Sequence, residues 1–250
     1  MSYVAVPHVS GSYRFLPAIS AYSAGVAATS GYDIAAWRFL DSPSLVEGFE
    51  RIDREIARRK LAPAALVGLE LRSPAAFDFE RFAKFNDEYR QLLADRSLLI
   101  GEVNPIARTN VIPLRDGPAE PAITTAFIVQ HSAGAGGIDF IVAGAGEIEG
   151  DLEPENIVAR GDLSPAGLEA KVDCVLRQMT ARLMALGAGT DSPTTINVYT
   201  AHYVEHLSTM VVSHLPAAAR NGFVRWMAKP PINEIEFEMD CRRFTTWRVI

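Results

Sequence analysis

The sequence predicts an α+β fold in which helices cover one face of a sheet. Apolar runs of strand length recur along all 250 residues, and segments with helical spacing of apolar residues lie between them. On both sides of a glycine-rich segment the order of elements is strand, helix, strand, helix, strand, strand, over about 115–130 residues each. Since 48% of the residues are hydrophobic, the chain can fill the core that such a fold requires.

Strands and helices alternate in the first half. Ser44 is expected to open a helix, because Glu47 three positions later completes a capping box and apolar residues then recur at helical spacing. Asp78 is expected to cap a second helix, which carries Phe82 and Tyr89 on its buried side. The intervening apolar runs predict strands at residues 19–28, 64–71, 109–114 and 123–129.

Residues 131–137 break both periodicities. The segment contains three glycines, which indicates a linker between an N-terminal domain (1–130) and a C-terminal domain (138–250). Each sheet would keep a second apolar face, and oligomerisation is a common way to cover such a face.

The second half repeats the signals of the first. Ser164 and Pro165 are typical of a helix start, and Gly187 is typical of a helix end. A further helix is expected at about residues 203–214. The apolar runs predict strands at residues 140–143, 194–200, 223–227 and 234–239.

Charge and composition limit the partners. The chain has 24 basic and 30 acidic side chains and a formal net charge of −6, whereas a general nucleic-acid or anionic-membrane surface is basic. Neither partner is expected. Two cysteines, Cys174 and Cys241, make no disulfide framework and suit a reducing compartment. Without a leader pattern or a membrane-spanning apolar run, the chain is expected to be a soluble cytoplasmic protein.

One motif has the spacing of a metal site. His202 and His206 match H-x-x-E-H, which places two histidines on one face of a helix. The third ligand should be an acidic residue on a following helix, whereas the acidic residues that follow lie in the predicted strand 234–239. Exposed helix residues are the commoner meaning of the pattern, and no metal is expected.

The most informative segment runs from Asn104 to Val111. Arg108 lies at the start of a predicted strand, just after the turn at Pro105, where its planar group of donors would be held in place. Such a group suits bidentate binding of a carboxylate. From the residues alone, a surface arginine at a strand end is the commoner alternative, and both interpretations stay open.

A resemblance to a known family favours the binding interpretation. Residues 107–111 (A-R-T-N-V) resemble the A-R-[ST]-x-V signature of the Rid family, the reactive intermediate deaminases once called YjgF-like. Residues 82–89 resemble the family's F-x-x-x-N-x-x-Y helix, residues 233–238 its acidic closing strand, and Gly187 the glycine that ends its first helix. The order of elements agrees in both halves, so the resemblance covers nearly the whole chain as two fused copies.

The resemblance implies a fold and an activity. The fold would be two tandem chorismate-mutase-like domains, each a mixed sheet with two helices on one face. Three chains would supply six domains for two closed rings, which favours a homotrimer. Rid proteins with the arginine hydrolyse enamines and imines to ketones and ammonia without a metal or an organic cofactor, so no cofactor is expected.

The resemblance also implies roles for individual residues. Arg108 would bind the substrate carboxylate, and Glu234 would activate water. Substrate binding would involve Ser23, Asn110 and Arg220. Apart from the resemblance, Arg72 at the end of a predicted strand is a candidate for a second cation that binds the far carboxylate, and a surface arginine at a strand end is the open alternative.

Neither half carries a complete Rid-like site. Ile123 occupies the glutamate position of the first half, and Ala143-Gly144 stands in place of the serine–glycine pair in the second. A cleft that pairs Arg108 of one domain with Glu234 of another would be complete, and domain interfaces are where such pockets occur.

The expected substrate is a small dicarboxylate. Two-copy proteins of this length resemble the 2-aminomuconate deaminases of aromatic-compound breakdown, so hydrolytic deamination of 2-aminomuconate or a substituted relative to the oxo acid and ammonia is expected. Two alternatives stay open, a broad housekeeping enamine deaminase and a non-catalytic ligand-binding or chaperone-like homologue. The missing glutamate at Ile123 favours the latter. A zinc hydrolase that uses His202 and His206 is a more distant alternative.

Overall fold

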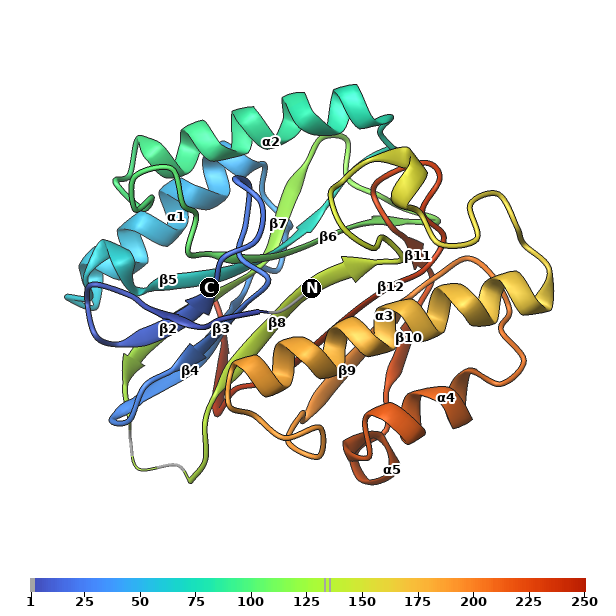
Figure 1. The fold of residues 1–250 in the computed structure, drawn as a ribbon. Helices are drawn as coiled ribbons and strands as arrows, with labels where there is room; N and C mark the ends of the chain where they lie inside the picture. Colours follow the sequence, from blue (N-terminus) through green and yellow to red (C-terminus); the bar gives the residue numbers. More distant parts are fainter. Residues whose placement is uncertain (1–2, 133, 135) are drawn as a thin grey trace.

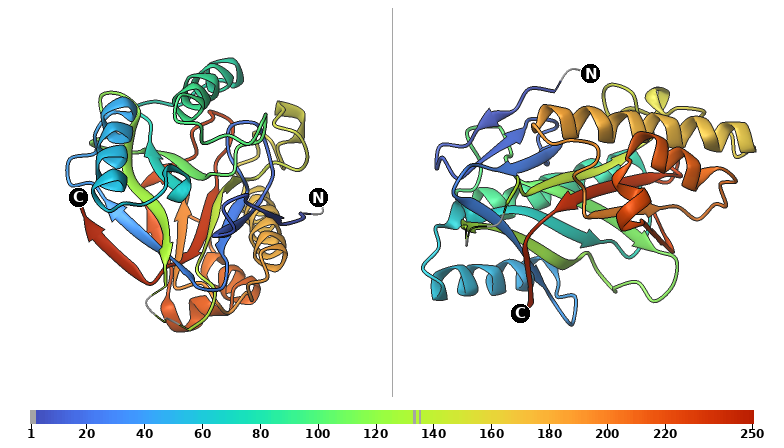
Figure 2. Two further views of the ribbon diagram at one scale, coloured as in Figure 1. Left: turned by 90° about the vertical axis from the view of Figure 1, so that its left-hand side faces the viewer. Right: turned by 90° about the horizontal axis from the view of Figure 1, so that it is seen from below.

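Two sheets pack face to face, and helices lie on both outer sides (Figures 1 and 2). The computed structural model describes residues 3–132, 134 and 136–250. The outer helices of the six-stranded sheet are α1 (Leu45–Arg58) and α2 (Phe79–Ala94). On the other side, α3 (Pro165–Ala185) packs on the seven-stranded sheet, and α4 (Leu207–His214) and α5 (Ala217–Asn221) extend this layer.

The strands form one seven-stranded and one six-stranded sheet. The seven-stranded sheet has the order β1 (Val6–Pro7), β2 (Tyr13–Leu16), β3 (Gly25–Ala28), β8 (Phe140–Gly146), β12 (Glu238–Arg243), β9 (Thr195–Tyr199) and β10 (Val224–Trp226). The six-stranded sheet has the order β11 (Ala228–Lys229), β6 (Ala107–Pro113), β5 (Leu66–Arg72), β7 (Ala122–His131), β4 (Tyr32–Arg38) and β13 (Thr246–Val249). Most neighbours are antiparallel, and the pairs β5–β6, β4–β13 and β9–β10 are parallel.

The expectation of tandem Rid domains is wrong, because the sheets exchange strands. β1, β2 and β3 leave the N-terminal part of the chain and pair with β8 in the sheet of the C-terminal strands. In return, β11 and β13 pair with β6 and β4 at the two edges of the other sheet. The predicted strands overlap β3, β5, β6, β7, β8, β9, β10 and β12, whereas β1, β2, β4, β11 and β13 were not predicted. The strands exchanged between the sheets find their partners far away in sequence, and local patterns carry no signal of such a partner.

The division of the chain at residues 131–137 stays a prediction. Residues 133 and 135 of the expected linker lie outside the described residues. On either side of this segment, β7 continues to His131 and β8 begins at Phe140, and these two strands belong to different sheets.

The inner faces of the two sheets contact each other through buried polar residues. Thr109 Oγ1 of β6 donates to Asp240 Oδ2 of β12 at 2.9 Å. Arg242 Nη1 lies 2.9 Å from Glu70 Oε1 of β5. The second face of each sheet, which the sequence suggested would be covered by another chain, is therefore covered within the chain. Assembly as a homotrimer stays a prediction.

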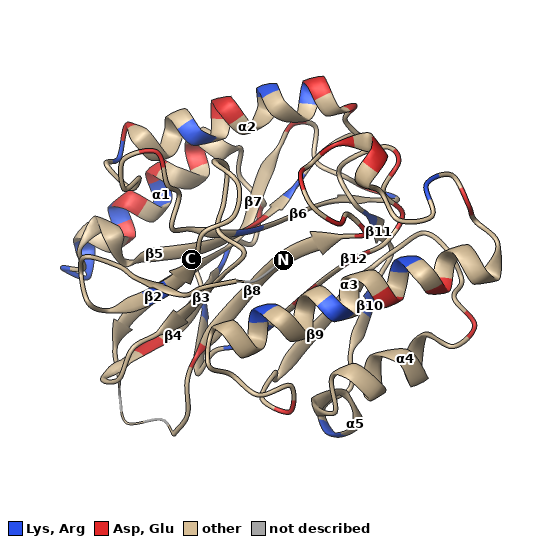
Figure 3. Cartoon of the chain, viewed as in Figure 1, with Lys and Arg blue, Asp and Glu red and all other residues tan. Residues whose placement is uncertain are grey.

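The local helix signals are confirmed. The side chains of Ser44, Asp78 and Ser164 each accept a hydrogen bond from the backbone N–H three residues on, at 3.3, 2.7 and 3.2 Å. Gly187 follows α3 with a φ of 72°, a conformation that glycine adopts without a steric penalty. Charged side chains of both signs lie along α1 and α2 (Figure 3).

Two elements begin later than expected. α4 begins at Leu207, so His202 lies before the helix. β12 begins at Glu238 instead of residue 234, and the preceding residues form an irregular segment. In the described part of the chain, no helix has the length and apolar character needed to span a membrane.

Candidate active site

A cavity of about 330 Å³ lies where α2, α3, β6, β8 and β12 meet. Its size is at the lower end of the range of small-molecule sites, about 300–1,000 Å³. Residues from both halves of the sequence line it, which follows from the exchange of strands. Its polar or ionisable lining residues are Tyr3, Tyr22, Arg108, Asn110, Asp151, Gln178, Arg182 and Glu238.

Arg108 is a buried cation in the wall of this cavity. Only 3% of the residue is exposed. Nη2 donates to Asn86 Oδ1 at 2.7 Å, and the guanidinium lies 4.6 Å from the ring centroid of Tyr22 and 4.8 Å from that of Tyr89. Burial lowers the pKa of Arg108, but a guanidinium keeps its proton in proteins. The cation is therefore held by aromatic rings and one amide, without a carboxylate in hydrogen-bond contact among the described residues.

Two donors in the cavity wall have no protein acceptor in the described part of the chain. They are Nη1 of Arg108 and Nδ2 of Asn110, and both atoms are buried. The two residues lie two positions apart on β6, so their side chains share one face of the strand. Asn110 is oriented by Ser73, whose Oγ donates to Asn110 Oδ1 at 3.0 Å. Because an unsatisfied buried donor costs about 1–3 kcal/mol, this pair is ready for an anionic or carbonyl oxygen of a ligand.

Glu238 is the buried acid of the cavity. It is 6% exposed at the start of β12 and lies against Gly144 of β8, where a Cβ atom would overlap Oε1. Burial and then the Asp240 carboxylate raise the pKa of Glu238 well above its ordinary value, although Arg108 acts in the opposite direction. The site therefore holds an acid that retains its proton to unusually high pH.

Arg182 supplies a second cation from α3. Its Nη1 donates to the carbonyl oxygen of Ala143 at 3.1 Å, and its Nε donates to the hydroxyl oxygen of Tyr3 at 3.1 Å. Gln178, one turn earlier on the same helix, accepts from Nη2 at 3.3 Å. Two cations and two acidic residues, of which Glu238 is buried and Asp151 is exposed, thus line a single cavity. The remaining wall is largely apolar, with Pro17, Ala18, Ile19, Phe82, Ile148, Leu152, Pro231, Ile232 and Ile235.

The structure brings together only part of the predicted site. Arg108 and Asn110 line the cavity, and Ser23 is fully buried with its hydroxyl donating to the carbonyl oxygen of Pro105 at 3.2 Å. Ser23 is not among the lining residues, but its backbone N–H fixes the turn before Arg108 by donating to Ile106 O at 2.9 Å.

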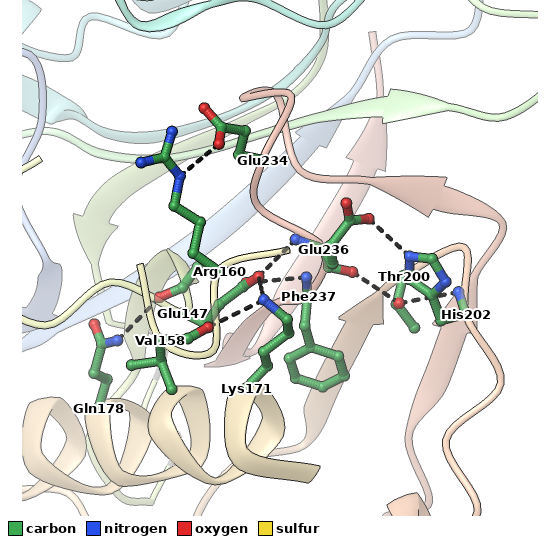
Figure 4. Close-up of polar contacts among 11 residues, drawn as sticks. Glu147, Val158, Arg160, Lys171, Gln178, Thr200, His202, Glu234, Glu236 and Phe237 are labelled. Carbon is green, nitrogen blue, oxygen red and sulfur yellow. Dashed lines mark hydrogen bonds and ion pairs between the residues drawn. The ribbon is translucent and has the colours of Figure 1, made fainter. Parts of the chain in front are cut away.

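The other three predicted residues lie outside the cavity. Glu234 is 44% exposed at its side chain and is turned toward Arg160, with Oε2 2.5 Å from Nε (Figure 4). Arg72 lies 5.9 Å from the ring centroid of Trp226. Arg220 donates to the carbonyl oxygen of Asp191 at 2.7 Å. The catalytic and binding roles of these residues stay predictions, and their positions give them no contact with the cavity.

The two histidines of the H-x-x-E-H motif do not share a helix face. His202 lies before α4 with Nε2 2.7 Å from Glu236 Oε2, and His206 Nε2 lies 3.9 Å from Glu169 Oε1. Among the described residues, no cluster of three or more histidine, cysteine, aspartate or glutamate side chains has a metal-binding arrangement.

Sequence comparison identifies the family. A family model described as 2-aminomuconate deaminase CnbZ matches residues 5–248. The chain belongs to the CnbZ family. It is also 35% identical over 235 residues to 2-amino-5-chloromuconate deaminase from Comamonas testosteroni, and the match covers 93% of both chains. This CnbZ-family chain is thus an enzyme that acts on carbon–nitrogen bonds, as the sequence predicted.

Backbone comparison of the CnbZ-family chain gives more distant likenesses. A chorismatase crystal structure is 12% identical, with a TM-score of 0.49, and the match covers 95% of this chain and 78% of that one. A cyanuric acid hydrolase from A. caulinodans is 14% identical, with a TM-score of 0.42, and the match covers 87% of this chain and 68% of that one.

Sequence reasoning missed Glu238 and Arg182 in this CnbZ-family enzyme. Signals for both were present. Lys171, Gln178 and Arg182 are spaced seven and four positions apart, which places three polar residues on one face of the helix. Glu238, Asp240 and Arg242 alternate along β12, which puts three charges on one face of a central strand.

Proposed function

We propose that this enzyme hydrolyses 2-aminomuconate, or a ring-substituted relative of it, to the 2-oxo acid and ammonia, with Glu238 as the proton-transfer group and no cofactor. The observation that carries the proposal is that one cavity holds a buried carboxyl group, Glu238, and a buried arginine with an unsatisfied donor, Arg108. Family membership and the 35% identical 2-amino-5-chloromuconate deaminase support the substrate class.

The two arginines fit the two ends of a dicarboxylate. Arg108 and Asn110 offer two unpartnered N–H donors to the carboxylate beside the amino group. Arg182, in the wall formed by α3, would bind the distal carboxylate by exchanging its contact with the Tyr3 hydroxyl. The apolar wall between them suits the conjugated carbon chain, whose substituents carry no charge.

Glu238 has the protonation state that the first step requires. 2-Aminomuconate is an enamine, and protonation at carbon by the Glu238 carboxyl gives the iminium ion and the Glu238 carboxylate. Arg108 and Arg182 favour the carboxylate, and burial and Asp240 favour the acid, so Glu238 can exchange a proton in both directions.

Water then completes the reaction. A water molecule attacks the iminium carbon while the Glu238 carboxylate accepts one of its protons, which gives the neutral carbinolamine. Glu238 returns that proton to the amino nitrogen, the carbon–nitrogen bond breaks, and ammonia leaves with the bonding electrons. The hydroxyl proton of the new carbonyl group passes to Glu238, which restores the acid for the next cycle.

The test is ammonia release from freshly generated 2-aminomuconate, with a chelator present throughout, by the wild type and by Glu238→Gln. Removal of a general acid–base group is expected to lower kcat by about 10²- to 10⁴-fold. The glutamine variant keeps the shape of the side chain but cannot donate a proton to carbon. Undiminished turnover by this variant would refute the role of Glu238, and no turnover by the wild type would refute the substrate.

A further inference from the structure

A buried ion pair outside the cavity has no part in the mechanism above. The side chains of Glu147 and Lys171 are fully buried, and Lys171 Nζ lies 3.3 Å from Glu147 Oε1. Neither residue lines the cavity, although Gly146 and Ile148 on either side of Glu147 do. Burial of two charges is unfavourable unless each finds further polar partners, so the partners indicate what the pair does.

The carboxylate of Glu147 holds two consecutive backbone amides. Glu236 N–H donates to Oε1 at 2.7 Å, and Phe237 N–H donates to Oε2 at 3.0 Å (Figure 4). The ladder between β8 and β12 begins only at Glu238, opposite Gly146. The Glu147 side chain therefore continues that ladder by two residues, immediately before the proposed acid.

Helix α3 fixes the position of Glu147 in turn. Lys171 Nζ also donates to the carbonyl oxygen of Val158 at 3.0 Å. Two turns further along the helix, Gln178 Nε2 donates to the carbonyl oxygens of Gly146 and Ile148 at 3.0 and 3.1 Å. The chain is thus held on both sides of Glu147, and Glu147 holds the segment that leads to β12 (Figure 4).

We propose that Glu147, held by Lys171, is a positioning residue for Glu238. The inference rests on the proposed function, in which Glu238 transfers the protons. Because the amides of residues 236 and 237 are fixed, the backbone of residue 238 has little freedom. Gly144, which has no side chain, leaves the space that the carboxyl group of Glu238 occupies. A misplacement of about 1 Å in a reacting group can lower a rate by about 100-fold.

The carboxyl group of Glu147 also acts on Glu238 through its charge. Burial raises the pKa of Glu147, whereas the amides of Glu236 and Phe237 and the Lys171 ammonium group lower it. The pKa of Glu238 is raised by burial and by the carboxylates of Asp240 and Glu147. It is lowered by the cations of Arg108 and Arg182. The partly buried Tyr22 lines the same cavity as a neutral phenol, since burial raises its pKa. Loss of the charge at residue 147 is therefore expected to lower the pKa of Glu238.

The experiment compares Glu147→Gln with Glu149→Gln. Glu149 is a matched control, because it also joins the segment after β8 to α3, through an ion pair with Arg177 at 2.9 Å. Both of these side chains are more than half exposed. Glu147→Gln is expected to lower kcat by about 100-fold, with KM within about threefold of wild type, because the arginines are untouched. The alkaline limb of its pH–rate profile should move to lower pH. The control should stay within about twofold of wild type, as exposed pairs contribute little.

A second readout does not depend on turnover. Hydrogen exchange at the amides of Glu236 and Phe237 should accelerate in Glu147→Gln and stay at the wild-type rate in Glu149→Gln. If the proposed substrate is wrong, the wild type shows no turnover, and exchange still decides whether Glu147 holds this segment. The inference would be overturned if a folded Glu147→Gln had the kcat, the alkaline limb of the pH–rate profile and the hydrogen-exchange rates of the wild type. Should that variant fail to fold, Glu147→Gln/Lys171→Met, which leaves no unpaired cation, is subjected to the same measurements.

Discussion

Replacement of Arg108 by methionine tests the carboxylate anchor most directly. The variant keeps an unbranched side chain of similar length but removes the guanidinium, so a substrate carboxylate in the cavity would meet no cation at this position. Loss of one partner of a buried charge pair costs about 3–5 kcal/mol. At 1.4 kcal/mol per factor of ten, kcat/KM should fall by about two to three and a half orders of magnitude.

The stability of the ligand-free fold should respond quite differently. Asn86 Oδ1 would lose its donor, at a cost of about 1–3 kcal/mol. Against this, the variant no longer buries a cation that has no carboxylate in hydrogen-bond contact within the described residues. The two effects oppose each other, and we expect the free energy of unfolding in urea to change by about 1 kcal/mol or less.

The assay pairs turnover with ligand-induced stabilisation. Muconate, a six-carbon dicarboxylate without the amino group, should stabilise the wild type by about 2.7 kcal/mol at one hundred times its Kd. It should stabilise Arg108→Met far less, and Arg108→Lys, which keeps the charge but loses the planar group of donors, should lie between the two. A kcat/KM within tenfold of wild type, or equal stabilisation of the methionine variant by muconate, would refute the assignment.

Three further predictions concern the same cavity. If Glu238 must start protonated, kcat/KM should be level at low pH and fall as the pH rises through the elevated pKa of Glu238. This alkaline limb of the pH–rate profile should be absent from the residual activity of Glu238→Gln. An alkaline limb that persists in the variant belongs to another group. Gly144→Ala places a methyl group on Glu238 Oε1, so kcat should fall by at least about tenfold while circular dichroism stays that of the wild type, and wild-type kcat would show that the carboxyl group need not lie there. Arg182→Met should raise KM for the dicarboxylate by about tenfold or more and leave an enamine with a single carboxylate unaffected; equal effects on both substrates would remove the distal-carboxylate role.

The sequence predicted those parts of the structure that depend on neighbouring residues. Helix starts at Ser44, Asp78 and Ser164 are set by a side chain and a backbone amide three residues apart, so a local pattern is sufficient. The pairing of β3 with β8 joins residues more than one hundred positions apart, and both strands are apolar throughout, so no local pattern distinguishes this partner from others.

The same limit applies to the site. Arg108 could be proposed because its motif is contiguous. Glu234 was proposed because residues 233–238 resemble the acidic closing strand of the Rid family, in which Glu234 takes the place of the water-activating glutamate, and Glu238 lies in the same segment. What separates the two is tertiary: Glu234 meets Arg160 near the surface, whereas Glu238 enters a cavity that exists only when β8 and β12 are paired.

The exchange of strands also constrains how the chain can be made. When β1, β2 and β3 leave the ribosome, β8 and β12 have not yet been synthesised. The edge of β3 therefore stays unpaired until more than one hundred further residues have emerged. Such distant pairings are slow to form, and unpaired strand edges associate readily with other chains. Cotranslational folding of the first half alone would therefore leave its first three strands without the sheet they belong to. The cavity, lined from both halves, takes shape only when synthesis is nearly complete.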